Sequence, residues 1–311
     1  MPASEFEIIR RHFGRPVSTA VLGVGDDAAL VRPTPGMEIA VSTDLLVEGR
    51  HFLAAADPRK LGHKALAVNL SDMAAMGAGP RWLTLALSLP AADEAWIGAF
   101  ADGLFALAAR FGVELIGGDT VRGPRSICIC IVGEVPAGQA LRRDGARPDD
   151  DIWVSGELGG AALALAHPGI DEAELRLHEP EPRVALGERL RAHASAAIDV
   201  SDGFAQDLGH ILERSACGAL VHYDRLPKCT AFARVAQPQL ERRCVLAGGD
   251  DYELIFTARQ GARAAIEDVA RETGVPLSRV GTTRRHETSL SILDGRGNEI
   301  PVARGFDHFS A

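Results

Sequence analysis

The sequence predicts a two-domain α/β protein, or α+β in the broader sense, with helices and strands in both halves. Its 311 residues exceed what one compact core of ordinary size needs, so we expect two cores. Apolar runs of helical and of strand period occur in each half. Between the halves, turn-forming residues gather from Pro136 to Asp151. We therefore expect an N-terminal domain at 1–137 and a C-terminal domain at 148–311.

The first half opens with an amphipathic pattern over 1–14, which predicts a helix and does not resemble a signal peptide, so we expect a cytoplasmic protein. Further along, helical spacing of apolar residues predicts helices at 58–76 and 93–110. The same half contains strand-like runs at 38–42, 82–89, 113–116 and 126–132.

The second half has the same mixture of elements. Strands are predicted at 151–155, 196–200, 219–223, 252–257 and 289–293. Helices are predicted at 184–193, 205–214 and 262–272.

Composition excludes several classes of function. The net charge of −9 disfavours nonspecific nucleic-acid binding, which needs Lys and Arg patches. No apolar run approaches the roughly 20 residues of a membrane span. The 5 cysteines are an odd set without CxxC spacing, which argues against a disulfide framework or a structural zinc site. The sequence has no GxxxxGK[ST] phosphate loop, so phosphate ligands would need a metal ion here.

Five separated acidic motifs are the main candidates for that metal. The first, 23–28, places Asp27 after two glycines, although a polar loop with a helix cap is the favoured explanation of such a motif when it stands alone. In the second, Ser42, Thr43 and Asp44 follow the strand predicted at 38–42, and alternation puts Ser42 and Asp44 on one side. Hydroxyl and carboxylate oxygens there suit Mg²⁺, while an ordinary helix cap is the alternative.

Asp72 is the most informative single acid. It follows Leu61, Ala65 and Val68 at helical spacing, so it continues an apolar stripe of the helix predicted at 58–76. An unpaired carboxylate on a packed helix face is costly. We therefore expect Asp72 to have a cation, a set of donors or a domain edge as compensation.

The remaining motifs, 117–120, 199–203 and 248–253, also place acids beside glycines at element boundaries. The first two follow predicted strands, and ligands of open α/β sheets bind at the carboxyl ends of strands. Asp202 is either a ligand or the cap of the next helix. A shared site for several metal ions and a polyphosphate would explain all five motifs with one cause.

Seven ordered motifs resemble the thiamine-monophosphate kinase family of the aminoimidazole-ribonucleotide-synthetase-like superfamily. The likeness covers nearly the whole chain. The motifs are GVGDDAA (23–29), VSTDLLVEGRHF (41–52), KALAVNLSDMAAMGAGPRW (64–82), LIGGDTVRGP (115–124), AIDVSDGFAQDLGHI (197–211), GGDDYELIF (248–256) and GFDHF (305–309).

The resemblance implies ATP-dependent phosphorylation of thiamine monophosphate with Mg²⁺, and an N-terminal sheet that pairs with its twin in a homodimer. Its implied metal ligands are Asp27, Ser42, Thr43, Asp44, Asp72, Asp119, Asp199 and Asp202. The implied ATP contacts are Gly118, Asp119, Arg143 and Ser201. The implied contacts to thiamine monophosphate are His51, Asp250 and Phe306. No protein base is required, because a phosphate acceptor with a second pKa of about 6 is already largely ionised.

The chain departs from the family pattern at two places. Asp250 stands where the family usually has Glu, so the carboxylate is one methylene shorter, and Glu179 replaces the first arginine of an RPxPR motif that ends at Arg183. Two other interpretations remain open at this point. One is another ATP-using member of the superfamily, and the other is a noncatalytic nucleotide or metal sensor.

Overall fold

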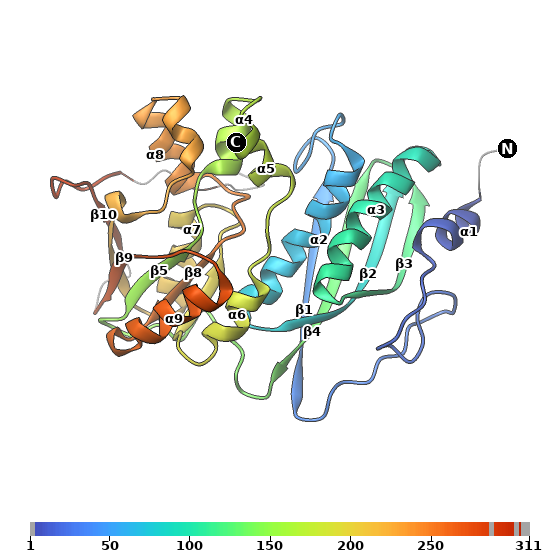
Figure 1. Cartoon of the computed structure of the whole chain (residues 1–311), viewed down its shortest axis with the longest axis horizontal. Coiled ribbons are helices and arrows are strands. Elements are labelled where there is room, and N and C mark those ends of the chain that lie inside the picture. Colours follow the sequence, from blue (N-terminus) through green and yellow to red (C-terminus); the bar gives the residue numbers. More distant parts are fainter. Residues whose placement is uncertain (1–3, 286–288, 302–304, 306–311) are drawn as a thin grey trace. The chain divides into compact units, whose positions relative to one another are not determined.

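The structure is a computed structural model that describes residues 4–285, 289–301 and Gly305 (Figure 1). The chain forms two compact units. The N-terminal unit comprises Met1–Met73 and Ala78–Gly138, and the C-terminal unit comprises Ala74–Gly77 and Gln139–Ala311. Each unit mixes helices with its own sheet, so the predicted fold class is confirmed.

The N-terminal unit contains a 4-stranded sheet in the order β1-β4-β2-β3. Its strands are β1 (Met37–Val47), β2 (Gly79–Leu89), β3 (Glu114–Arg122) and β4 (Ser126–Pro136), and only the β2–β3 pair is parallel. Its helices are α1 (Glu5–Ile8) with the π-helical η1 (Ile9–Phe13), α2 (Pro58–Ala75) and α3 (Glu94–Phe111).

The helices α2 and α3 lie on the same face of this sheet (Figure 1). Alternation along β2 buries Leu83, Leu85 and Leu87, whereas Ala86 between them is exposed. On β1, Val41 is 61% exposed and Leu45 is 52% exposed. One face of the sheet is therefore packed, and the other keeps exposed apolar side chains.

The C-terminal unit contains a 6-stranded sheet in the order β10-β7-β9-β5-β8-β6. Its strands are β5 (Asp151–Ser155), β6 (Ala196–Asp199), β7 (Gly218–His222), β8 (Leu254–Ala258), β9 (Leu277–Arg284) and β10 (Leu290–Leu293). Its α-helices are α4 (Gly160–Ala166), α5 (Asp171–His178), α6 (Val184–Leu190), α7 (Phe204–Arg214), α8 (Pro238–Ala247) and α9 (Arg263–Thr273). Short 3₁₀ turns are η2 (Tyr223–Arg225), η3 (Thr230–Arg234) and η4 (Gln260–Ala262).

The core of this unit forms on both faces of its sheet. Val154, Ile198 and Ile255 pack with buried side chains of α4, α7 and α8. Trp153 and Phe256, which alternate with them, stack with ring centroids 6.2 Å apart. Burial on two faces explains why these strands read as continuous apolar runs in the sequence.

Several strand predictions were wrong in their ends, and two of these bear on the site. β1 continues to Val47 and β3 to Arg122, so Ser42 to Asp44 and Gly117 to Asp119 lie inside strands and not after them. Their polar and glycine residues interrupt the apolar pattern, but the backbone pairing with β4 and β2 continues through them. The prediction also missed β9, α5 and α8, which carry few apolar residues. Within the described residues, no helix has both the length and the apolar character needed to span a membrane.

Candidate active site

Ser42 and Asp72 come together in the N-terminal unit. The stripe on α2 is confirmed, since Leu61 and Val68 are buried and Asp72, which continues it, is half-buried. The hydroxyl of Ser42 donates a hydrogen bond to the carboxylate of Asp72. Asp44 lies two residues along β1 on the same half-buried face. The predicted compensation of Asp72 therefore includes at least one hydroxyl donor, and hard oxygen atoms from β1 and α2 meet at this place.

Two other predicted ligands of this unit lie differently. Thr43 is exposed on the opposite face of β1, so its side chain does not join those of Ser42 and Asp44. Asp119 is exposed within β3. Just before it, Gly118 has a φ of 151°, and a Cβ there would lie 1.9 Å from the carbonyl oxygen of Leu85. Only glycine permits β3 to approach β2 this closely, which explains the GGD sequence.

Asp27 lies in an exposed loop that is closed by hydrogen bonds between Leu22 and Leu30. The loop begins with a clamp that the sequence did not reveal. The Glu114 carboxylate on β3 accepts from the amide and hydroxyl of Ser18, both at 2.6 Å, and from the hydroxyl of Thr19 at 2.7 Å. Burial alone would raise the pKa of Glu114, but these donors outweigh it and lower the pKa to about 2. The clamp ties the Asp27 loop to β3.

His51 lies in the turn after β1 and is half-buried. Its Nδ1 accepts a hydrogen bond of 3.0 Å from the backbone N–H of Val47. In the neutral imidazole the proton is therefore on Nε2, which can donate to an anion. This tautomer fits the predicted contact with a phosphate-bearing substrate.

Two loops of the C-terminal unit meet at one sheet edge. β6 ends at Asp199, one residue before the predicted end, and pairs antiparallel with β8, so Asp199 lies opposite Leu254 at the start of β8. The loops that follow β6 and precede β8 are then neighbours. Asp250 donates its N–H to the carbonyl of Ser201 at 2.9 Å. A Cβ at Gly249 would lie 2.3 Å from the same carbonyl, so glycine is required for this close contact.

The alternative of Asp202 as a helix cap is excluded, because the N-cap of α7 is Gly203 and no side chain caps it. The acceptor of the loop amides is Asp207, one turn into α7. Its Oδ2 accepts from the N–H groups of Ser201, Asp202 and Gly203 at 3.1, 3.1 and 3.0 Å. Asp207 is 2% exposed. Burial and the charge of Asp199 raise its pKa to about 7.

Asp250 adopts a strained backbone conformation. Its φ is 67° and that of Tyr252 is 50°, values that residues other than glycine seldom take. The hydroxyl of Tyr252 donates to the Asp250 carboxylate at 2.9 Å. The shorter side chain found at this position is thus held by its own loop.

The two remaining acids of this motif are structural. Asp251 is 7% exposed and accepts the N–H of Gly159 at 2.7 Å, so the glycine-rich turn before α4 turns its amide toward Asp251. Glu253 is 1% exposed and pairs through two bonds of 2.7 and 2.6 Å with Arg183. Arg176 donates to Glu253 at 3.2 Å, and Ser155 does so at 2.6 Å. Arg183, the last arginine of the altered RPxPR motif, therefore neutralises the buried carboxylate of Glu253.

The last two predicted contacts are Arg143 and Phe306. Arg143 is exposed in the segment before β5, and its carbonyl accepts a hydrogen bond of 2.8 Å from the Ser215 hydroxyl. Phe306, like most of the GFDHF motif, lies outside the described residues.

The donor set suits Mg²⁺ without forming a complete cage. In residues 4–285, 289–301 and 305, no three His, Cys, Asp or Glu side chains converge to hold a metal ion. Burial raises the pKa of Asp207, and the negative charges of Asp199 and Asp202 raise it further, so both repel a charged Asp207 carboxylate. Such repulsion favours a cation, and Mg²⁺ commonly takes one or two carboxylates and completes its shell with water and phosphate oxygens. The residues therefore fit that ion.

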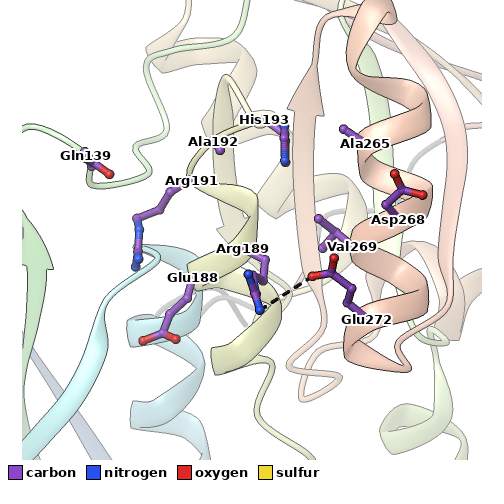
Figure 2. Close-up of a pocket in the computed structure, with 10 residues that line it drawn as sticks. All are labelled: Gln139, Glu188, Arg189, Arg191, Ala192, His193, Ala265, Asp268, Val269 and Glu272. Carbon is purple, nitrogen blue, oxygen red and sulfur yellow. Dashed lines mark ion pairs between the residues drawn. The ribbon is translucent and has the colours of Figure 1, made fainter.

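A surface cavity of about 680 Å³ lies elsewhere in the C-terminal unit, between α6 and α9 (Figure 2). Arg189 and Glu272 form an exposed ion pair of 3.7 Å at its wall. None of the predicted site residues lines it. We therefore assign the functional site to the acidic motifs, whose oxygen atoms suit Mg²⁺, and not to this cavity.

The first comparison defines the class of the chain. Residues 25–135 match the family described as AIR synthase related protein, N-terminal domain. This segment includes Asp27, the strands β1 to β4 and the helices α2 and α3. The chain is thus a protein with an AIR-synthase-related fold.

Full-length comparisons are more specific. A thiamine-monophosphate kinase of Salmonella typhimurium is 44% identical over 330 residues, covering 100% of this chain and 99% of that protein. The crystal structure of thiamine-monophosphate kinase from Stenotrophomonas maltophilia K279a has a TM-score of 0.84 at 47% identity, covering 92% of this chain and 94% of that one. A structure of AaThiL complexed with AMPPCP and TMP has a TM-score of 0.76 at 27% identity, covering 92% of both chains. The chain belongs to the thiamine-monophosphate kinase family.

Proposed function

We propose that this protein transfers the γ-phosphoryl group of ATP to thiamine monophosphate, giving thiamine diphosphate and ADP. The observation that carries the proposal is the full-length identity to thiamine-monophosphate kinases. The acidic loops support it, because their oxygen atoms suit a metal-dependent phosphoryl transfer. The complex of AaThiL with AMPPCP and TMP shows that a relative of this fold binds both kinds of ligand.

The roles of the individual residues are part of this proposal. Asp27, Ser42, Thr43, Asp44, Asp72, Asp119, Asp199 and Asp202 hold Mg²⁺ ions. Gly118, Asp119, Arg143 and Ser201 contact ATP, and His51, Asp250 and Phe306 contact thiamine monophosphate. Thr43, whose side chain lies opposite those of Ser42 and Asp44, would act through its backbone carbonyl.

The chain's own residues position the two substrates and hold the metal ions, and no side chain needs to remove a proton. The acceptor phosphate has a second pKa of about 6 and is largely ionised at neutral pH. Bound Mg²⁺ supplies the positive charge that reduces repulsion between the two phosphate groups. Gly118 lets β3 lie directly against Leu85 of β2, which fixes the backbone that carries Asp119. His51 donates from Nε2, and Asp250 is fixed by Tyr252.

Phosphorus NMR tests the proposal directly. The purified chain is incubated with ATP, Mg²⁺ and thiamine monophosphate, and the signals of thiamine diphosphate and ADP are expected to grow together. Nucleotide binding without turnover would instead indicate a noncatalytic sensor. ADP formation only with a different acceptor would indicate another enzyme of the superfamily.

A homodimer and a cytoplasmic location belong to the same proposal. The face of the N-terminal sheet opposite α2 and α3 exposes Val41, Leu45 and Val121. Exposed apolar patches of this kind mark interfaces, and a second copy offers the same surface. Light scattering should show twice the chain mass, and Val41→Lys should shift it toward the monomer. The domain boundaries, 1–137 and 148–311, remain a proposal for independently folding segments.

A further inference from the structure

We propose that Asp207 is a positioning residue that sets the metal affinity of the C-terminal unit by holding the backbone of the 201–203 loop. This inference rests on the proposed function for the identity of the ligand, a divalent cation. Asp207 itself is directed at backbone N–H groups and not at substrate.

Asp207 accepts backbone hydrogen bonds in an unusual arrangement. One carboxylate oxygen accepts three successive N–H groups, those of Ser201, Asp202 and Gly203, at 3.0 to 3.1 Å. An N-cap side chain normally satisfies such amides from in front of the helix. Here the acceptor comes from inside α7, because Gly203 has no side chain and a φ of 122°. The loop is therefore wrapped around a buried carboxyl group.

This wrapping fixes the backbone of one proposed metal ligand, Asp202, and of one proposed ATP contact, Ser201. Ser201 and Asp202 both donate their amides to Asp207, so the direction of each Cα–Cβ bond is set by that contact. The carbonyl of Ser201 in turn accepts the N–H of Asp250 at 2.9 Å, which carries the constraint to the neighbouring loop. Partners of this kind, one shell beyond the ligands, change metal affinity by roughly 10-fold to 100-fold when removed.

The test uses three full-length variants and Mn²⁺ as a spectroscopic substitute for Mg²⁺. Asp207→Ala removes the acceptor, whereas Asp207→Asn keeps one oxygen at the same place. Asp150→Asn is the matched control, because Asp150 is 4% exposed, accepts the N–H of Arg147 at 2.9 Å and does not bond to the 201–203 loop. Mn²⁺ affinity is measured by electron paramagnetic resonance, and amide protection of 201–203 by hydrogen exchange without metal.

We expect Asp207→Ala to weaken the affected Mn²⁺ site by about 10-fold to 100-fold and to speed exchange of these amides. Asp207→Asn should recover part of both losses, and Asp150→Asn should lower thermal stability without changing either. The effect of Asp207→Ala should also shrink in an Asp202→Asn background, since both residues act on one site.

A folded Asp207→Ala variant with native Mn²⁺ affinity or native exchange would overturn the inference. So would an equal loss of affinity in Asp150→Asn, because general destabilisation would then explain it. The proposed function fails separately: a chain that binds Mn²⁺ through Asp207-dependent amides but never forms thiamine diphosphate would leave this inference standing.

Discussion

The two units hold most of their proposed oxygen ligands on different kinds of backbone. In the N-terminal unit, Ser42, Asp72 and Asp119 belong to β1, α2 and β3, elements whose backbone groups are paired along the element. In the C-terminal unit, the proposed metal ligand Asp199 ends β6, but the proposed metal ligand Asp202 and the proposed substrate contact Asp250 lie in loops. Loop amides need other acceptors, because an unpaired buried N–H is costly.

The C-terminal unit meets this need with buried carboxylates. Asp207 accepts amides of one loop, Asp251 accepts the amide of Gly159, and Glu253 is neutralised by Arg183. Acids that look alike in the sequence therefore divide into two kinds. Some are proposed to bind ligands through their carboxylate oxygens. Others are buried and hold the backbone or side chains around those ligands in place. The predictions below separate these kinds by the size and type of their effects.

The largest effect is expected from two proposed metal ligands of the N-terminal unit. Asp44→Asn or Asp119→Asn should lower kcat by about 10²-fold or more, because each removes a charge that stabilises phosphoryl transfer. The fold should remain, since both are inside paired strands and are not fully buried. Steady-state kinetics and thermal melts measure the two quantities.

Asp102→Asn is the matched control. Asp102 is an exposed residue of α3, so the variant should behave like the native chain. Near-native rates for Asp44→Asn and Asp119→Asn with Mg²⁺ would remove both from the proposed metal site.

Next in size is a loss of stability at Glu253. Glu253→Gln leaves Arg183 partly buried without its charged partner, which should lower the free energy of unfolding by about 3 kcal/mol. Denaturant unfolding measures this change. Glu272→Gln, at the exposed pair with Arg189, should change it by less than about 0.5 kcal/mol. Equal effects of the two substitutions would show that burial does not decide the role of Glu253.

Regular elements of the fold could be predicted because their apolar spacing is strong. The stripe through Leu61 and Val68 correctly identified α2 and marked Asp72 as exceptional. The ends of β1 and β3 could not be predicted, because pairing with distant strands, and not local composition, keeps Ser42 and Gly118 extended.

The acids that accept backbone amides were harder to find in the sequence than the proposed metal ligands. Asp207 occupies an ordinary helix position in the sequence, and its function depends on amides four to six residues earlier that turn back toward it. The available signal was Gly203 at the start of a helix with no capping side chain, which requires an acceptor from elsewhere. Glu114 gave no local signal, since its donors lie about 95 residues away.

A smaller, pH-dependent effect is expected at Asp251. Burial raises its pKa to about 8 in the folded chain, although the amides of Gly159 and Ala161 act in the opposite direction. The folded state therefore keeps a proton between pH of about 4 and 8 that the unfolded state has lost, so stability falls as pH rises through this window. Asp251→Asn lacks this dependence.

Melting temperatures of the native chain and of Asp251→Asn, measured from pH 5 to 9, should diverge in favour of the variant as pH rises. The corresponding difference in the free energy of unfolding should change by at most about 1.4 kcal/mol per pH unit, the limit for one proton. A constant difference across this range would mean that Asp251 is ionised in the folded chain throughout.

The smallest effect is expected at the Glu114 clamp, and its sign is opposite. The pKa of Glu114 is lowered to about 2, so the folded state favours the carboxylate and its stabilisation is present above the ordinary pKa of about 4.5. Glu114→Gln retains one oxygen acceptor for Ser18 and Thr19 and should cost about 1 kcal/mol at pH 7. That cost should disappear as pH falls from 4.5 toward 2, because the native clamp then becomes protonated. Chemical unfolding across this range measures it. A cost that stays constant with pH would indicate that shape alone, and not the carboxylate charge, ties the Asp27 loop to β3.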